Sequence, residues 1–119
     1  MSVEGHWTVR FASVAGDKVQ RESGGVVTLF AGHLTGGDTW AYYSGTYTLD
    51  GRRMTLRVSV GIHFTQGGES ILGGPLVPYT LVGSAEVSED SRQLRVSSHV
   101  EGNENAVIIA VLTKVFDLP

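Results

Sequence analysis

The chain has 119 residues, the length of one ordinary domain, and we expect a single domain over residues 1–119. It contains no cysteine, which excludes disulfide frameworks, cysteine-ligated zinc, iron–sulfur clusters and thiol catalysis. Nine Lys and Arg residues against twelve Asp and Glu residues give a net charge of −3. The basic residues form no stripe that could neutralise a phosphate backbone, so we expect no nucleic-acid binding.

The apolar runs are short. The longest, residues 106–112, is far below the roughly 20 residues that a membrane-spanning helix needs. The first residues show no basic start followed by an apolar stretch, as a secretory leader would. We therefore expect a cytoplasmic protein that does not bind membranes.

Apolar and polar residues alternate along most of the chain, at the period of two that indicates β-strands. In chain order, the alternation appears at 5–11 and then in a short β-branched run at 26–30. It is clearest over 54–64, where the apolar residues occupy the even-numbered positions. Further alternating runs cover 79–87 and 94–101, and helical periodicity appears nowhere.

Sixteen glycines and three prolines predict many turns. Gly-Gly pairs, which we expect at corners, lie at 24–25, 36–37, 67–68 and 73–74. Counting a short run near Ile71 and Leu72, the pattern gives about eight strands joined mainly by hairpins. Eight antiparallel strands in a chain of this length predict an all-β fold, an up-and-down barrel of the lipocalin kind. A two-sheet sandwich is the alternative.

The last expected strand, 106–116, is apolar on both faces. Val107, Ile109 and Val111 point to one side, whereas Ile108 and its even-numbered neighbours point to the other. A strand that is apolar on both faces is usually covered on both. Since a small barrel offers only one inner face, we expect a homodimer that uses the strand from Ala106 to Phe116.

Catalytic and metal-binding patterns are weak. The four histidines do not lie at ligand spacing on one element, so we expect neither a metal nor another cofactor. Ser84 lacks the glycine setting of a nucleophile elbow, and the acidic residues gather in turns. Asp38 lies between Gly37 and Trp40, where its ordinary role is to cap the amides of an Asx-type turn. We expect no catalytic residue.

The aromatic residues suggest a ligand pocket, although filling of the core is their commoner use. A small apolar or aromatic ligand would lie against Trp7, Trp40, Tyr42, Tyr47 and Phe64. Strict alternation places Trp40 and Tyr42 on one face of their strand, with Tyr43 and Tyr47 on the other. The pocket therefore requires a bulge at Gly45 that brings Tyr47 onto the face of Tyr42.

Two stretches resemble known families. Gly5-His6-Trp7 resembles the Gly-x-Trp signature of lipocalin-like and avidin-like barrels, in which the Trp closes one end. The segment GGDTWAYYSG at 36–45, followed by LRVSSHVEGNENAV at 94–107, resembles the GrlR family, negative regulators of bacterial type III secretion. Short matches in the same order run from residue 5 to 116.

The resemblance implies a lipocalin-like barrel, a homodimer, no catalysis, and regulation through contact with a transcriptional regulator protein. The family's acidic contact loop falls on 49–52 of this chain, which makes Asp50 and Arg52 the candidate partner-binding residues. Here Arg52 and Arg53 reverse the local charge. We therefore expect a non-enzymatic regulatory or sensor protein that acts through protein contacts. The alternative is a barrel that binds a small apolar or aromatic ligand, and a barrel enzyme comes third.

Overall fold

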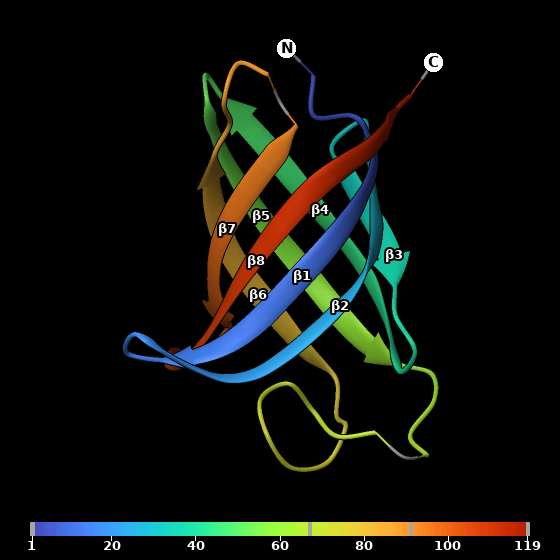
Figure 1. Cartoon of the computed structure of the whole chain (residues 1–119), viewed down its shortest axis with the longest axis vertical. Helices are drawn as coiled ribbons and strands as arrows, with labels where there is room; N and C mark the ends of the chain where they lie inside the picture. The colour runs from blue at the N-terminus through green and yellow to red at the C-terminus, as the bar shows by residue number, and fades with distance from the viewer. Residues whose placement is uncertain (1, 67, 91, 119) are drawn as a thin grey trace.

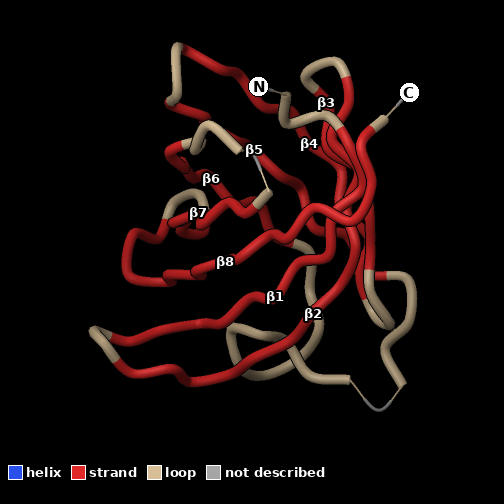
Figure 2. Tube along the Cα trace, turned by 45° about the horizontal axis from the view of Figure 1, so that its top comes forward, coloured by secondary structure: helices blue, strands red, loops and turns tan. Residues whose placement is uncertain are grey.

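A computed structural model of the chain describes residues 2–66, 68–90 and 92–118. Its eight strands are β1 (Gly5–Ala15), β2 (Lys18–Phe30), β3 (His33–Gly37), β4 (Ala41–Asp50), β5 (Arg53–Ile62), β6 (Tyr79–Glu86), β7 (Gln93–Val100) and β8 (Asn103–Asp117). Each strand pairs antiparallel with the next, and β8 pairs with β1, so the sheet closes into a barrel (Figures 1 and 2). The prediction of an all-β, eight-stranded up-and-down barrel is confirmed.

The alternation read from the sequence corresponds to the two faces of the barrel wall. In β5, Met54, Leu56 and Val60 are buried in the interior, whereas Thr55 and Arg57 between them are exposed. β7 shows the same order, with its apolar residues buried. The inward-facing apolar side chains of the strands therefore meet in one central core.

Two strand assignments from the sequence are wrong. Ile71 and Leu72 form no strand and lie in the connection 63–78 between β5 and β6. The missing strand is β3, where Gly36 and Gly37 pair with β2 instead of forming a corner. A side chain at Gly36 would place its Cβ 2.0 Å from the Val26 carbonyl oxygen, so the glycine allows two strands to approach closely.

β5 also ends two residues earlier than the pattern predicts. After Ile62 the chain turns, and the backbone amides of His63 and Phe64 both donate to the Trp40 carbonyl oxygen, at 2.9 and 3.3 Å. Phe64 thus lies outside the strand and is exposed. Alternation does not reveal this end, because the residues continue the pattern after the partner strand has stopped.

The two ends of the barrel differ. The termini and the turns β2–β3, β4–β5 and β6–β7 lie at one end, which we call the closed end (Figure 1). The connection 63–78 and the other three turns lie at the opposite, open end. In the residues that the structure describes, no helix is long and apolar enough to cross a membrane.

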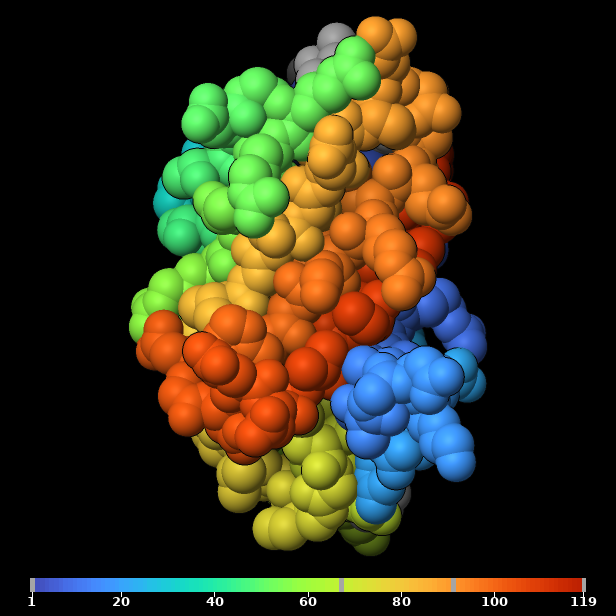
Figure 3. Space-filling model, turned by 90° about the vertical axis from the view of Figure 1, so that its left-hand side faces the viewer, coloured from blue at the N-terminus to red at the C-terminus, as the bar shows by residue number. Residues whose placement is uncertain are grey.

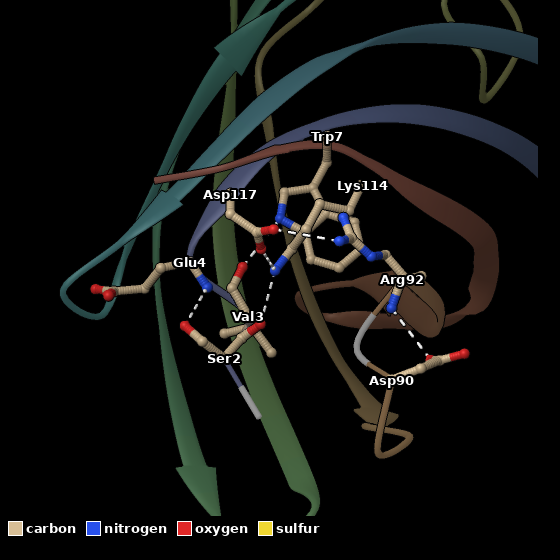
Figure 4. A network of polar contacts seen from close by, with 8 residues as sticks. All are labelled: Ser2, Val3, Glu4, Trp7, Asp90, Arg92, Lys114 and Asp117. Carbon is tan, nitrogen blue, oxygen red and sulfur yellow. Dashed lines mark hydrogen bonds and ion pairs between the residues drawn. The ribbon is translucent and has the colours of Figure 1, made fainter. Parts of the chain in front are cut away.

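A buried tryptophan seals the closed end. Trp7 is 1% exposed, and its indole Nε1 donates to the Val3 carbonyl oxygen at 3.0 Å. The Lys114 ammonium lies 5.2 Å from the centre of the Trp7 ring, donates to the Ser2 carbonyl oxygen at 2.7 Å and pairs with Asp117 at 2.9 Å (Figure 4). The N-terminal segment therefore lies across this end and leaves the buried ammonium with three partners.

Candidate functional site: the mouth cavity

A cavity of about 550 Å³ lies at the open end, within the size range of small-molecule sites. We call it the mouth cavity. Four aromatic rings line it: Phe11, Tyr43 and Tyr79 from strands, and Trp40 from the corner between β3 and β4. The connection 63–78 contributes Glu69, Ser70, Ile71 and Leu76. Ser70 and Ile71 are buried, so the connection packs against the barrel at the edge of this cavity.

Asp38 organises the corner between β3 and β4. Its Oδ1 accepts hydrogen bonds from the backbone amides of Trp40 and Ala41, at 2.9 and 2.7 Å. This is the capped turn that the sequence predicts. Its Oδ2 accepts a further hydrogen bond from the Tyr43 hydroxyl, which the sequence did not indicate. The carboxylate therefore has a fixed orientation at the wall of the mouth cavity.

Gly25 makes the space for this pair. A Cβ at this position would lie 2.7 Å from the Gly37 carbonyl oxygen, 3.0 Å from the Tyr43 hydroxyl and 3.2 Å from Asp38 Cβ. Any side chain would therefore displace the Asp38 corner. The prediction of a corner at Gly24 and Gly25 is wrong, because both lie inside β2, opposite Arg10 and Val9 of β1.

The two tyrosines of the cavity remain neutral at physiological pH. Burial, and next the hydrogen bond to Asp38, raise the pKa of Tyr43 far above its usual range. Burial, with a smaller contribution from the negative charge of Asp38, raises the pKa of Tyr79 to about 12. The Tyr79 hydroxyl can donate a hydrogen bond to a ligand, whereas the Tyr43 hydroxyl already donates to Asp38 and can only accept one; neither can act as a base near pH 7.

Trp40 leaves a buried donor without a partner. Its Nε1 is inaccessible to solvent and makes no hydrogen bond within the described part of the chain. The indole edge packs against Gly68, where an added Cβ would lie 2.4 Å from Nε1. An unpaired buried N–H group costs roughly 1–3 kcal/mol.

The rim of the mouth cavity is charged. Arg21 of β2 forms an ion pair with Glu69, which joins the strand to the connection 63–78. Glu22 and Asp38 also line the cavity. The lining therefore holds three acidic residues and one basic residue, and the basic one is already paired.

The interior below the mouth is nearly filled. A second cavity of about 90 Å³ lies there, with an almost wholly apolar lining that includes Leu34, Leu56 and Val96. It shares Phe11, Tyr43, Val60 and Tyr79 with the mouth cavity. The barrel thus offers a polar, aromatic mouth above a small apolar pocket.

The five aromatic residues proposed from the sequence do not form one pocket. Trp40 lines the mouth cavity. Trp7 and Tyr47 are buried toward the closed end, where the Tyr47 amide donates to the Gly32 carbonyl oxygen. Tyr42 is 52% exposed on the outer wall, and its ring covers Gly61. The fifth residue, Phe64, is exposed beyond the end of β5.

The expected bulge at Gly45 is absent, which explains the correction. β4 and β5 pair without a break from Ala41 opposite Ile62 to Asp50 opposite Arg53. Tyr43 and Tyr47 therefore face inward together, and Tyr42 faces outward. The alternation in the sequence also allowed this arrangement, with Tyr43 and Tyr47 on the inner face. Only the closure of the barrel decides which face is the inner one.

The candidate partner residues lie far from this cavity, at the closed end. Asp50 is exposed beside the β4–β5 turn, and Arg52 pairs with Glu89 across the β4–β5 and β6–β7 turns at 2.6 Å. Glu89 therefore offsets part of the basic charge that Arg52 adds to this loop.

Within residues 2–66, 68–90 and 92–118, no group of three or more His, Cys, Asp or Glu side chains could hold a metal ion. Comparison with known proteins adds no assignment: no protein-family model and no curated protein matches the chain.

Proposed function

We propose that the protein binds a small molecule in the mouth cavity and acts as a non-enzymatic sensor or carrier. The observation that carries this proposal is the cavity itself, which combines a fixed carboxylate with four aromatic rings. Sites of this kind have a mainly apolar lining and a few oriented polar groups.

Binding fits the chemistry of the cavity better than catalysis. The Asp38 carboxylate already accepts three hydrogen bonds, from two amides and the Tyr43 hydroxyl. Both tyrosines keep their protons near neutral pH because of their raised pKa values. The cavity therefore offers groups that orient a ligand rather than groups poised to transfer a proton.

Tryptophan fluorescence tests this proposal directly, because Trp40 lies in the cavity and Trp7 at the other end. Small aromatic probes should change the emission of the wild-type protein, and the change should disappear in Trp40→Phe. Filling the mouth with Ser23→Phe should abolish binding, whereas Ser44→Phe on the outer face of β4 should not. Equal binding by both phenylalanine variants would contradict a site in the mouth.

A second function, regulation through protein contacts, is favoured by the outer face of β8. Val107, Ile109 and Val111 line a groove of about 540 Å³, together with Val14 and Val19 from the β1–β2 hairpin. Figure 3 shows this hairpin, in blue, beside the orange and red C-terminal strands. We infer that a second copy of the chain covers the groove, as expected for the strand from Ala106 to Phe116.

The charges at the groove suit a twofold arrangement. Arg10 and Arg95 lie beside Val111 at one end, and Asp17 lies at the other end, in the β1–β2 turn. Rotation by a twofold axis would bring the basic end of one copy opposite the acidic end of the other, which makes the surface self-complementary.

Light scattering at micromolar concentration tests the homodimer. We expect twice the chain mass of 12.7 kDa, and a shift to the single mass in Ile109→Glu. Ser59→Glu, on the exposed outer face of β5, is the matched control and should leave the dimer intact. A wild-type protein of single mass would contradict the interface.

The resemblance to the GrlR family adds one further test of the regulatory proposal. A transcriptional regulator captured by the protein should be held less well after charge reversal at Asp50 or Arg52. Unchanged capture by Asp50→Lys and Arg52→Glu would remove the 49–52 loop from the proposed contact.

A further inference from the structure

The mouth cavity carries a negative charge that nothing inside it balances. Among the described residues, its lining contains Glu22, Asp38 and Glu69 but only one cation, Arg21, and that guanidinium is held by Glu69. The donors to the Asp38 carboxylate are two backbone amides and a tyrosine hydroxyl, all of them neutral, and His63 Nε2 bonds the main-chain carbonyl oxygen of Asp38 at 3.0 Å. The carboxylate is thus oriented by hydrogen bonds without being neutralised.

The charge of Asp38 reaches across the cavity. It contributes to the raised pKa of Tyr79, after the larger contribution of burial. Tyr79 comes from β6 and Asp38 follows β3, so the two residues reach the cavity from separate parts of the wall. The Asp38 charge therefore acts on a group from another part of the cavity wall.

The aromatic walls of the cavity add a second attraction for a positively charged ligand. The faces of aromatic rings attract cations, most strongly for Trp and also for Tyr and Phe, and the attraction grows where water is excluded. Here Phe11, Trp40, Tyr43 and Tyr79 line the same space as the unbalanced carboxylate. Rings and carboxylate favour the same class of ligand, by two independent interactions.

We propose that the mouth cavity selects a small organic cation, a protonated amine or quaternary ammonium group carried on an apolar or aromatic body. This inference rests on the proposed function of the cavity. The ammonium group would lie near Asp38 and the rings, and the apolar body would point toward the apolar pocket beneath Phe11 and Tyr79. Carboxylate ligands such as fatty acids would meet acidic residues and an arginine that is already paired.

The test uses four probes with the same ring and different charge: benzyltrimethylammonium, benzylammonium, benzyl alcohol and benzoate. At pH 7 and low salt, calorimetry should show both cations binding about tenfold or more tightly than the alcohol, with benzoate weakest. Either order of the two cations supports the proposal. Affinity for the cations should fall as salt rises, while that for the alcohol should not.

Two variants locate the effect. Asp38→Asn keeps an oxygen for the turn amides but removes the charge, and should weaken the cations about tenfold while leaving benzyl alcohol unchanged. Glu22→Gln removes a rim charge from an exposed residue and should weaken the cations two- to threefold at low salt. If Asp38→Asn does not fold, Glu22→Gln and the salt series still test whether the cavity selects cations.

The outcomes separate this inference from the proposed function. If no probe of any charge binds, the mouth cavity is not a ligand site and both proposals fall. If benzyl alcohol or benzoate binds as tightly as the cations, the site stands and the selection of cations is refuted. Cation affinities that are unchanged in both variants and at high salt would likewise refute the selection of cations.

Discussion

The closed and open ends of this barrel each hold an ionised side chain, and they treat it differently. At the closed end Lys114 is almost completely buried, and its ammonium contacts the Ser2 carbonyl oxygen, Asp117 and the Trp7 ring. At the open end the Asp38 carboxylate has three neutral donors and faces a cavity of about 550 Å³. The Lys114 charge is buried and paired with an opposite charge. The Asp38 charge is held by neutral donors and faces the cavity.

The two tryptophans repeat the contrast. Trp7 Nε1 donates to the Val3 carbonyl oxygen, while Trp40 Nε1 is buried without a partner in the described residues. A buried polar group that is satisfied stabilises the fold, and one that is unsatisfied has a cost that function can offset. This contrast is consistent with our proposal that a ligand binds at the open end, whereas the closed end is packed and its polar groups are paired.

The largest expected effect is a loss of stability when the tryptophan of the closed end, and not that of the open end, is removed. Trp7→Ala should lower the free energy of unfolding by about 3–5 kcal/mol, because it removes a fully buried ring. Trp40→Ala should cost about 1–2 kcal/mol, since its ring is half-buried and its N–H group has no partner among the described residues. Urea unfolding measures the free energy of unfolding of both variants. Equal losses in the two would contradict the difference between the ends.

A backbone substitution at the mouth should have the next largest effect. Gly25→Ala should destabilise the protein by about 1–3 kcal/mol and abolish probe binding, because its Cβ would meet Gly37, Tyr43 and Asp38. Gly24→Ala is the control in the same strand: its nearest new contact is the Val9 carbonyl oxygen at 3.1 Å, away from Asp38. Gly24→Ala should retain binding, and its loss in both variants would count against the role of Gly25.

Alkaline pH should affect the open end through its tyrosines. The folded-state pKa of Tyr79 is raised to about 12, so its contribution to stability is complete below pH 10 and is lost as the pH rises from 10 toward 12. By pH 11 this tyrosine alone should have lowered the free energy of unfolding by about 1 kcal/mol. Urea unfolding at pH 9, 10 and 11 should show a smaller loss in Tyr79→Phe, and an identical loss would exclude Tyr79 as the source.

The smallest effect is expected at the closed end. The hydrogen bond from Lys114, first among several causes, lowers the pKa of the exposed Asp117 carboxyl. Asp117→Asn should nevertheless reduce the melting temperature only slightly, because Ser2 and the Trp7 ring still hold the ammonium. A loss as large as that of Trp7→Ala would mean that the ion pair, and not the ring, seals this end.

Much of the fold follows from local patterns. The alternation from Met54 to Ile62 and from Leu94 to Val100 predicts strands that are buried on one face, and both are present. The capped turn at Asp38 is equally local, because a short side chain reaches amides two and three residues ahead. The pattern fails at β3 and Phe64, where only pairing with a neighbouring strand decides whether a residue is in the sheet.

The sequence by itself determined the class of the fold, because a period of two and frequent turns are properties of neighbouring residues. Alternation also left two choices for the inner face of the strand after Asp38, the face of Tyr42 or the face of Tyr43 and Tyr47. Only the tertiary structure chose Tyr43, since closure of β8 on β1 defines which face is inside. The same closure brings Phe11, Trp40, Tyr43 and Tyr79 around one cavity. Residues so far apart in the chain meet only when the barrel is complete.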